Sequence, residues 1–263
     1  MALSSTWVAR LAEILGEPGR VEPAGGVFRV TAGKRTLAVK VGTGAADEAD
    51  GLRRLASVPG GPPVPDVVLV DGDLLVTTWV DSAPRTPAAE QDLGRRLATL
   101  HAAPHEAWGG GSRWVGLCPV DPATTTSAAA FYGARLLDLA GRCGLSGAVE
   151  RVVGRLERLI PPDPPALVHG DLWWGNVLWG DDGRGWILDP SVHGGHPEED
   201  LAMLALFGSV PAHLVAAYSE VRPLEPGWQE RTALFQLCPL LVHAVLFGGS
   251  YRCQAASVAA RYS

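Results

Sequence analysis

The stretch that decides the fold reads Leu167-Val168-His169-Gly170-Asp171-Leu172-Trp173-Trp174-Gly175-Asn176, and it continues through Val177-Leu178-Trp179 to Trp186-Ile187-Leu188-Asp189-Pro190. Three polar side chains stand among apolar flanks: Asp171, Asn176 five positions later, and Asp189 eighteen positions later. Phosphoryl transfer from a nucleotide needs one carboxylate to align the attacking hydroxyl, and an amide with a second carboxylate to hold magnesium. The stretch therefore predicts a phosphoryl-transfer site in which Asp171 is the catalytic base and Asn176 and Asp189 bind Mg²⁺.

The apolar runs at 177–179 and 186–188 are separated by a loop rich in glycine and aspartate, which predicts a β-hairpin. Asn176 enters this hairpin and Asp189 leaves it, so antiparallel pairing brings an amide oxygen and a carboxylate to one hard cation. The interval from Asp171 to Asn176 matches the catalytic loop of protein kinases. Those kinases have Arg where Gly170 stands, and Asp-Phe-Gly where Asp189 is followed by proline, so control through an activation segment is not expected.

A second candidate group lies upstream, in the run Thr36-Leu37-Ala38-Val39-Lys40-Val41. This run resembles the strand that presents a lysine to the phosphates of ATP in kinases. Glu48, on a predicted helix over 45–56, can form the ion pair that orients such a lysine. The neighbouring Asp47 is an alternative partner that helix phase does not separate from Glu48, and a lysine on a solvated strand face is the alternative to both.

Two further segments are candidates for ATP contact. Gly25 and Gly26 precede a predicted strand and can let backbone amides approach a phosphate, although a two-glycine turn between strands is common without a ligand. Thr78 and Val80 end the run before a proline-bearing connector, where the backbone can hydrogen bond an adenine edge. A buried strand is the alternative for that second segment.

Periodicity along the chain changes from strand-like to helical. The first part predicts a helix at 7–16, strands at 27–31, 36–42, 66–70 and 74–80, and the helix at 45–56. The second part predicts helices at 88–102, 127–140, 145–160, 198–207, 211–220, 228–247 and 251–261. This order predicts an α+β, bilobal, protein-kinase-like fold with a small β-rich N-lobe and a mainly helical C-lobe. We expect residues 1–80 to form the nucleotide-binding lobe, 81–87 a hinge connector, and 88–263 the catalytic and substrate lobe.

Composition limits the classes of function. The chain has 263 residues, of which 47% are hydrophobic and 19% charged, and its formal net charge is −6. These values indicate a globular protein and argue against nucleic-acid or anionic-membrane binding. No apolar run is expected to reach the roughly 20 residues of a spanning helix, and the first residues lack the pattern of a secretion signal. A cytoplasmic protein without an obligate protein partner is therefore expected.

Several polar residues around the predicted site have structural interpretations. His169 is expected to anchor the loop by hydrogen bonding, and Asp200 to cap a helix or brace the catalytic loop. Glu198 and Glu199 are expected to form a solvated first turn of that helix. A zinc site at His193 and His196 is conceivable, but oxygen ligands at Asn176 and Asp189 suit magnesium better.

These motifs together resemble those of the fructosamine kinases, or ketosamine kinases, a family related to aminoglycoside phosphotransferases and choline kinases. His169-Gly170-Asp171-Leu172-Trp173 with Gly175-Asn176 is similar to the family's H-G-D-L-W-x-G-N. Asp189-Pro190 and the later Gly195-His196, Glu198 and Asp200-Leu201-Ala202-Met203 are similar to its D-P-A and G-H-x-E-x-D-L-A-M. The first lobe departs from the pattern, because the segment between Gly26 and Lys40 is short and Thr78 stands where relatives often carry Glu.

The resemblance implies that ATP, with Mg²⁺, phosphorylates a sugar hydroxyl, typically O3 of a ketose attached to an amine, after which the unstable product sheds the sugar. It also implies that Trp173, Trp228 and His243 lie in the pocket for the ketosamine or glycated amine. Two alternatives stay open. The acceptor can be another hydroxylated amine of the aminoglycoside or choline type, or the chain can be a nucleotide-binding regulator without turnover.

Overall fold

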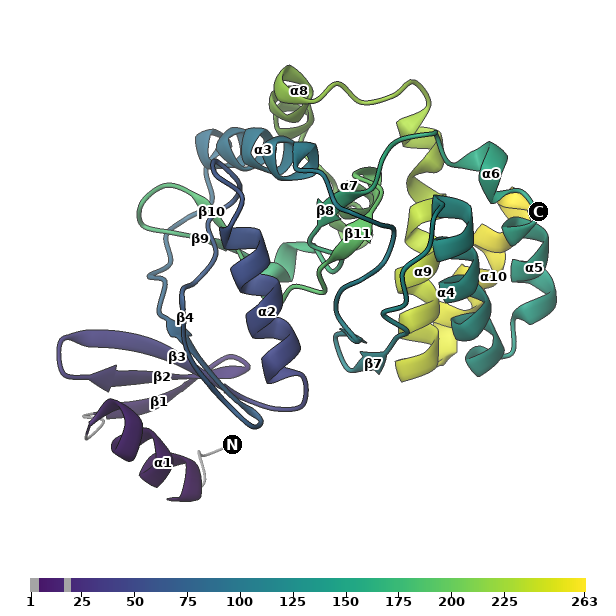
Figure 1. Ribbon diagram of the computed structural model, residues 1–263. Coiled ribbons are helices and arrows are strands. Elements are labelled where there is room, and N and C mark those ends of the chain that lie inside the picture. Colours follow the sequence, from purple (N-terminus) through teal and green to yellow (C-terminus); the bar gives the residue numbers. More distant parts are fainter. Residues whose placement is uncertain (1–4, 17–19) are drawn as a thin grey trace.

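The computed structural model describes residues 5–16 and 20–263, which form a small β-rich lobe and a larger helical lobe (Figure 1). In the small lobe, helices α1 (Ser5–Leu15) and α2 (Ala45–Ala56) lie beside one antiparallel sheet. The sheet has the order β1-β2-β3-β5-β4. Its strands are β1 (Arg20–Ala24), β2 (Val27–Ala32), β3 (Arg35–Val41), β4 (Val67–Asp71) and β5 (Leu74–Thr78).

Strand β3 directs its lysine into the cleft because its side chains alternate. Leu37 and Val39 are buried against Leu11 of α1 in the core of the small lobe. Successive side chains of a strand point to opposite faces of the sheet, and Ala38 and Lys40 accordingly line the cavity between the lobes. The position of Lys40 is therefore a consequence of strand periodicity.

The helical lobe surrounds three short strand pairs. Its helices are α3 (Pro87–Ala102), α4 (Ala128–Cys143), α5 (Ser146–Val153), α6 (Leu156–Leu159), α7 (Glu198–Leu204), α8 (Ala212–Val221), α9 (Trp228–Phe247) and α10 (Gly249–Tyr262). The pairs are β6 (Trp114–Val115) with β7 (Cys118–Pro119), β8 (Ala166–Val168) with β11 (His193–Gly195), and β9 (Val177–Trp179) with β10 (Gly185–Ile187). A short 3₁₀ turn, η1 (Trp174–Asn176), precedes β9.

Helix α9 lies at the centre of the helical lobe, where it packs against α4, α7 and α10 (Figure 1). Its Leu237 and Leu241 are fully buried. By length and composition alone, α9 is also the one helix in residues 5–16 and 20–263 that is apolar enough to span a membrane. The expectation that no segment reaches spanning length is therefore wrong for 228–247, and one side of this helix, which includes Leu234 and Leu240, is buried in the protein.

The connector between β5 and α3 is attached to the hairpin of β9 and β10. Ser82 forms a β-bridge with Gly180, and the Ala83 amide donates to the Trp179 carbonyl at 2.7 Å. The guanidinium of Arg85 lies 4.1 Å from the ring centre of Trp174, a cation–π contact. Residues 81–87 thus tie the lobe junction to the segment that carries the candidate catalytic residues.

Several elements differ from the sequence prediction, which does not include the short strands β6, β7 and β11; two further differences concern longer segments. Strand β1 is absent from that prediction, because Pro23 and the charges around it break the alternating pattern; it lies at the edge of the sheet, where a proline is tolerated. The single helix expected over 145–160 is two helices, with the chain turning at Gly154 and Arg155. Neither difference moves the segments that carry the site.

Gly94 allows α3 and α8 to pack closely, and its replacement tests that packing. A Cβ atom at Gly94 would lie 2.4 Å from the Leu214 carbonyl oxygen. We expect Gly94→Ala to lower the free energy of unfolding by roughly 1–3 kcal/mol in urea titrations. Gly147→Ala is the matched control, because no atom lies within 4 Å of the position that its methyl group would take and alanine favours a helix by about 0.5–1 kcal/mol. Equal stability of the Gly94 variant and the parent would contradict the packing described.

Candidate active site

The two lobes meet at the ammonium group of Lys40. Its Nζ lies 2.7 Å from Glu48 Oε2 on α2 and 3.0 Å from Asp189 Oδ2 in the helical lobe. Burial acts to lower the pKa of Lys40, but the charges of Asp189 and Glu48 outweigh it and raise this pKa above its ordinary value. Asp47 points elsewhere and accepts from the Arg113 amide at 3.3 Å. Of the two acids that helix phase does not separate, Glu48 is thus the partner of the lysine.

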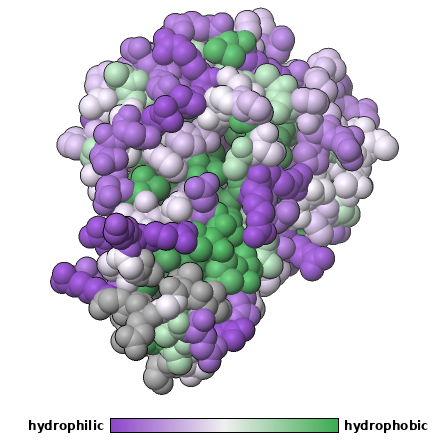
Figure 2. Space-filling view, turned by 60° about the vertical axis from the view of Figure 1, so that its left-hand side comes forward, coloured by the Kyte–Doolittle hydropathy of each residue, from purple (hydrophilic) through white to green (hydrophobic). Residues whose placement is uncertain are grey.

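A cavity of 340 Å³ lies between the sheet and the β9–β10 hairpin. Apolar side chains gather in a hollow between the small lobe and the rest of the molecule (Figure 2). The cavity's lining is mostly apolar but includes the lysine cluster; it comprises Ala24, Val27, Ala38, Lys40, Glu48, Leu52, Pro65, Leu75, Thr77, Thr78, Trp79, Val80, Ser82, Leu178, Leu188 and Asp189. A largely apolar cleft with a few polar groups at one end is typical of a small-molecule site.

The predicted nucleotide contacts take different positions around this cavity. Thr78 lines it, but the Thr78 amide donates to Asp66 and its hydroxyl accepts from Asp66. Val80 also lines it, and within the described residues no hydrogen bond engages the backbone of Val80. Gly25 and Gly26 form the exposed two-residue turn between β1 and β2, next to the lining. Val80 therefore offers backbone groups to a ligand in this cavity, whereas the Thr78 amide is already engaged.

The hairpin brings Asn176 and Asp189 to its open end. Val177 pairs with Ile187, and the Leu188 amide donates to the Asn176 carbonyl at 2.9 Å. The Asn176 side-chain nitrogen donates to the Asp171 carbonyl at 2.8 Å. Its side-chain oxygen has no protein partner in the part of the chain described, so it is available as a ligand for a hard cation.

Asp189 and Asp171 face a second cavity of 410 Å³, which also includes Lys40 and Asn176. Asp189 has a φ of 53°, the one positive value at a non-glycine position in the described residues, and aspartate tolerates this region better than most residues. Burial, followed by the charges of Asp189 and Asp200, raises the pKa of Asp171 to about 7. A general base works best when its pKa lies near the operating pH.

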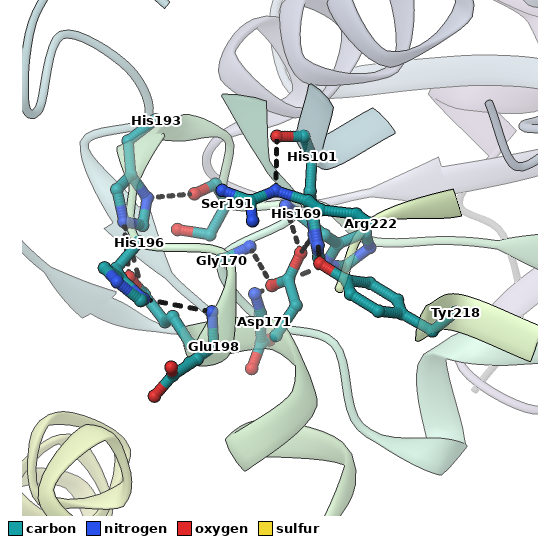
Figure 3. A network of polar contacts seen from close by, with 12 residues as sticks. His101, His169, Gly170, Asp171, Ser191, His193, His196, Glu198, Tyr218 and Arg222 are labelled. Atoms are coloured by element: carbon teal, nitrogen blue, oxygen red, sulfur yellow. Dashed lines mark hydrogen bonds and ion pairs between the residues drawn. The ribbon is translucent and has the colours of Figure 1, made fainter. Parts of the chain in front are cut away.

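The carboxylate of Asp200 on α7 is fully buried and holds the candidate catalytic loop. His101, His169 and Gly170, which contact it, are shown in Figure 3. Asp200 Oδ2 accepts from the His169 amide at 2.8 Å, and Oδ1 accepts from the Gly170 amide at 2.9 Å. His101 Nε2 lies 3.0 Å from Oδ2, while its Nδ1 lies 2.9 Å from the hydroxyl of Tyr218. Burial alone would raise the pKa of Asp200, but the hydrogen bond and charge of His101 help to lower it. A charged carboxylate therefore fixes the two residues before Asp171.

His169 and Gly170 complete this support. His169 Nε2 lies 2.9 Å from the Leu188 carbonyl, and the Asp171 amide lies 3.2 Å from His169 Nδ1. The ring thus connects the loop to the hairpin. Gly170 has a φ of 78°, and a Cβ atom there would lie 2.2 Å from the Ser191 carbonyl oxygen. A side chain at this position, such as the arginine of protein kinases, does not fit the space.

The first turn of α7 is buried, which contradicts the expectation of a solvated turn. Glu198 is held by Arg231, with Arg231 Nε 2.9 Å from Glu198 Oε2. Glu199 accepts from the Tyr132 hydroxyl at 2.6 Å and lies 3.1 Å from His193 Nε2. These acids pair with groups from other elements because α7 lies inside the helical lobe, where charges require partners.

The histidines that suggested zinc are buried within this packing. His193 Nδ1 lies 2.9 Å from the Ser191 carbonyl, and the His196 ring stacks on Phe235 with centres 4.9 Å apart. Across residues 5–16 and 20–263, no group of three or more His, Cys, Asp or Glu side chains could hold a metal ion. Oxygen atoms of Asn176 and Asp189 therefore remain the candidate ligands.

A third cavity, of 530 Å³, continues from Asp171 toward the ends of α7 and α9. Trp173 and His243, two of the predicted substrate residues, line it. Trp228 does not, because it begins α9 fifteen residues before His243, which is about 22 Å along a helix axis. The prediction that Trp228 lies in this pocket is therefore wrong. Phe207 also lines the cavity, but it follows α7 without any sequence signal that would have indicated a site.

Comparison with known proteins agrees with this geometry. Residues 39–262 match the model of the family described as fructosamine kinase. The chain belongs to the fructosamine kinase family.

Relatives in this family match over different lengths. A probable ketoamine kinase of Lactiplantibacillus plantarum is 32% identical, over 95% of this chain and 96% of its own. A probable ketoamine kinase of Synechocystis is 36% identical, over 69% of this chain and 64% of its own, so the match spans less than two thirds of that relative. The crystal structure of a candidate fructosamine-3-kinase from Thermobifida fusca has a TM-score of 0.89 and 38% identity, over 99% of both chains.

More distant structures define the fold that the fructosamine kinases share. An aminoglycoside phosphotransferase solved with streptomycin and ATP has a TM-score of 0.70 at 11% identity, over 99% and 97% of the two chains. A choline kinase of Streptococcus pneumoniae has a TM-score of 0.67 at 15% identity, over 98% and 97%. These likenesses confirm the predicted bilobal protein-kinase-like fold.

Asp200→Asn tests the support of the catalytic loop. The carboxamide can accept from only one of the His169 and Gly170 amides, and its NH₂ group faces the other. We expect the free energy of unfolding to fall by roughly 1–3 kcal/mol near neutral pH. Because the folded-state pKa of Asp200 is lowered, its stabilisation is lost as pH falls through that value, so the difference should shrink below about pH 4.

Asp50→Asn, at an exposed position on α2, is the matched control and should change stability by less than about 0.5 kcal/mol. Urea titrations at several pH values provide the measurement. An Asp200 variant as stable as the control at neutral pH would show that the buried carboxylate does not hold the loop.

Proposed function

We propose that this chain is an ATP- and Mg²⁺-dependent kinase that phosphorylates a sugar hydroxyl of a ketosamine, of the fructosamine or ribulosamine type, and so initiates deglycation. The observation that carries the proposal is the convergence of Lys40, Asp171, Asn176 and Asp189 on one cavity. This cavity adjoins an apolar cleft on one side and the cavity of Trp173 and His243 on the other, since each neighbour shares lining residues with it. The phosphoryl donor, the catalytic groups and the acceptor hydroxyl can therefore occupy three adjoining cavities in that order.

On the donor side, the 340 Å³ cleft suits an adenine ring, with the free backbone groups of Val80 as hydrogen-bond partners. Lys40, held by Glu48, is oriented toward the phosphates. Asn176 and Asp189 would hold Mg²⁺, and their oxygen atoms are of the type this ion prefers. Magnesium neutralises charge on the transferring phosphoryl group. Asp189 is paired with Lys40 in this structure. The carboxylate that would hold Mg²⁺ therefore lies next to the ammonium group that would contact the phosphates.

On the acceptor side, Asp171 is placed to orient a hydroxyl and take its proton. Burial and the charge of Asp189 raise its pKa to about 7; a cation held by Asp189 would offset the share due to that charge, so the Asp171 carboxylate can accept a proton near neutral pH. Alignment supplies much of the rate enhancement in phosphoryl transfer. The hydrogen bonds that Asp200 makes to the preceding residues support this alignment, since they fix the loop that carries Asp171.

The class of acceptor is inferred from the family and from the charge of its cavity. The relatives named as ketoamine kinases favour a sugar attached to an amine. Among the residues that line the 530 Å³ cavity, Asp171 is the one acid. A polycationic aminoglycoside would bring several ammonium groups to a site with one carboxylate, whereas a ketosamine requires no second acid.

A substrate panel tests the proposal directly. ADP release should be measured with ATP and Mg²⁺ in the presence of Nε-fructosyl-lysine, Nε-ribulosyl-lysine, choline and an aminoglycoside. We expect turnover with at least one ketosamine, and its loss when EDTA removes the metal. Turnover of choline or the aminoglycoside alone would replace the proposed acceptor class, and ATP binding without any turnover would favour the regulator.

Asp171→Asn tests the role of the base. The substitution keeps the shape of the side chain but removes its capacity to accept a proton. We expect turnover to fall by about 10²- to 10⁴-fold and the dissociation constant for ATP to change little. Asp181→Asn, at an exposed turn position, should retain parental turnover. Unchanged turnover in the Asp171 variant would rule out the proposed role.

A further inference from the structure

We propose that the acceptor cavity selects ketosamines whose amine carries an aromatic or other large apolar group. This inference rests on the proposed function and specifies the part of the substrate beyond the sugar. Its basis is a continuous row of rings, here called the aromatic wall, formed by Trp173, Phe207, His243, Phe247 and Tyr251. All five residues line the 530 Å³ cavity that begins at Asp171.

The rings of the aromatic wall contact one another in sequence. Ring centres are 5.9 Å apart for Trp173 and Phe207, and 5.3 Å apart for Phe207 and His243. His243 lies 4.9 Å from Tyr251, and Tyr251 lies 6.2 Å from Phe247. The wall combines the catalytic loop, the segment after α7, and helices α9 and α10. Such spacing is that of packed aromatic pairs, so the wall presents one preformed apolar surface.

Exposed apolar side chains are concentrated at this cavity. Six large apolar residues are exposed in the described residues, and four of them line it: Leu117 (73%), Trp173 (39%), Phe207 (45%) and Phe247 (65%). Single exposed apolar residues are ordinary on a protein surface, whereas a cluster of them marks a binding site. Burial of these side chains by a ligand is favourable because it removes apolar area from water.

The aromatic wall is continuous with the catalytic groups. Asp171 and Trp173 line both the 410 Å³ cavity of the candidate metal ligands and the 530 Å³ acceptor cavity. A sugar hydroxyl at Asp171 therefore directs the rest of its molecule along the wall. The acceptor cavity lies within the range of about 300–1,000 Å³ found for drug-sized ligands. The group on the amine is the part of a ketosamine that extends beyond the sugar and can cover the rest of this wall.

Charge in the cavity argues for a neutral group. Among the described residues that line the cavity, Asp171 is the one acid, and none is a lysine or arginine. His243 Nδ1 lies 2.7 Å from the Pro239 carbonyl of its own helix, so that nitrogen is already engaged. The ammonium and carboxylate of a free amino acid would leave water without charged partners, which costs free energy. An aromatic or aliphatic group carries no such cost.

The test uses one sugar on three amines. Fructose adducts of 2-phenylethylamine, of ethylamine and of lysine (through Nε) should be compared by kcat/KM with ATP and Mg²⁺. We expect the phenylethylamine adduct to exceed the other two by about tenfold or more, mainly through a lower KM. Equal values for the ethylamine adduct, or a preference for the lysine adduct, would overturn the inference. The second result would indicate that the rings attract a cation instead.

Equilibrium binding separates this inference from the proposed function. Calorimetric titration with the three adducts reports selectivity without requiring turnover. Tighter binding of the phenylethylamine adduct supports the inference even if no adduct is phosphorylated, a result that would contradict the kinase proposal alone. Equal or undetectable binding of all three adducts would overturn the inference, and phosphorylation of them would still leave the kinase proposal standing.

Two variants assign the selectivity to the aromatic wall. Phe207→Ala and Phe247→Ala each remove an exposed ring, and thermal melting should show that both still fold. We expect each to reduce the ratio of phenylethylamine to ethylamine adduct in kcat/KM, or in affinity, by about fivefold to tenfold. Leu137→Ala, an exposed position on α4 outside the cavity lining, should keep the parental ratio. An unchanged ratio in both aromatic variants would refute the proposal.

Discussion

One buried negative charge constrains the site, since a carboxylate without water must be matched by donors. Asp200 meets this requirement with the His169 and Gly170 amides and the His101 ring. These donors come from α3 and from the loop after β8, so one charge fixes two segments distant in sequence. Asp171 follows the held amides directly. The geometry of the candidate base is thus set by a residue that does not itself face the cavity.

The ion pair of Lys40 with Asp189 connects the two lobes. Lys40 is carried by a strand whose other face packs on α1, and its ammonium reaches Glu48 and Asp189 at 2.7 and 3.0 Å. The hairpin that positions Asp189 is in turn pinned to the connector through Ala83 and Trp179. The candidate site therefore needs residues from both lobes, and it forms where the sheet, the hairpin and the connector meet.

Sequence patterns predicted the features that depend on neighbours along the chain. The resemblance of the run at 36–41 to the lysine-bearing strand of kinases indicated Lys40, and the two apolar runs predicted the hairpin that brings Asn176 toward Asp189. Features decided by packing between distant segments were not accessible. The burial of Glu199 depends on its contacts with Tyr132 and His193. The position of Phe207 at the cavity depends on its ring contacts with Trp173 and His243. Trp228 failed for a different reason: the predicted helix at 228–247 already separates it from His243 by fifteen residues, and the motif alone had suggested a shared pocket.

The proposed chemistry requires that Asn176 and Asp189 together bind the divalent cation beside Asp171 and opposite Lys40. Diffraction near the manganese absorption edge, from crystals grown with Mn²⁺ and a non-hydrolysable ATP analogue, tests it most directly. We expect an anomalous peak at about 2.0–2.3 Å from the Asn176 side-chain oxygen and an Asp189 carboxylate oxygen. A peak coordinated by other residues, with Asn176 and Asp189 facing away from the nucleotide, would contradict it.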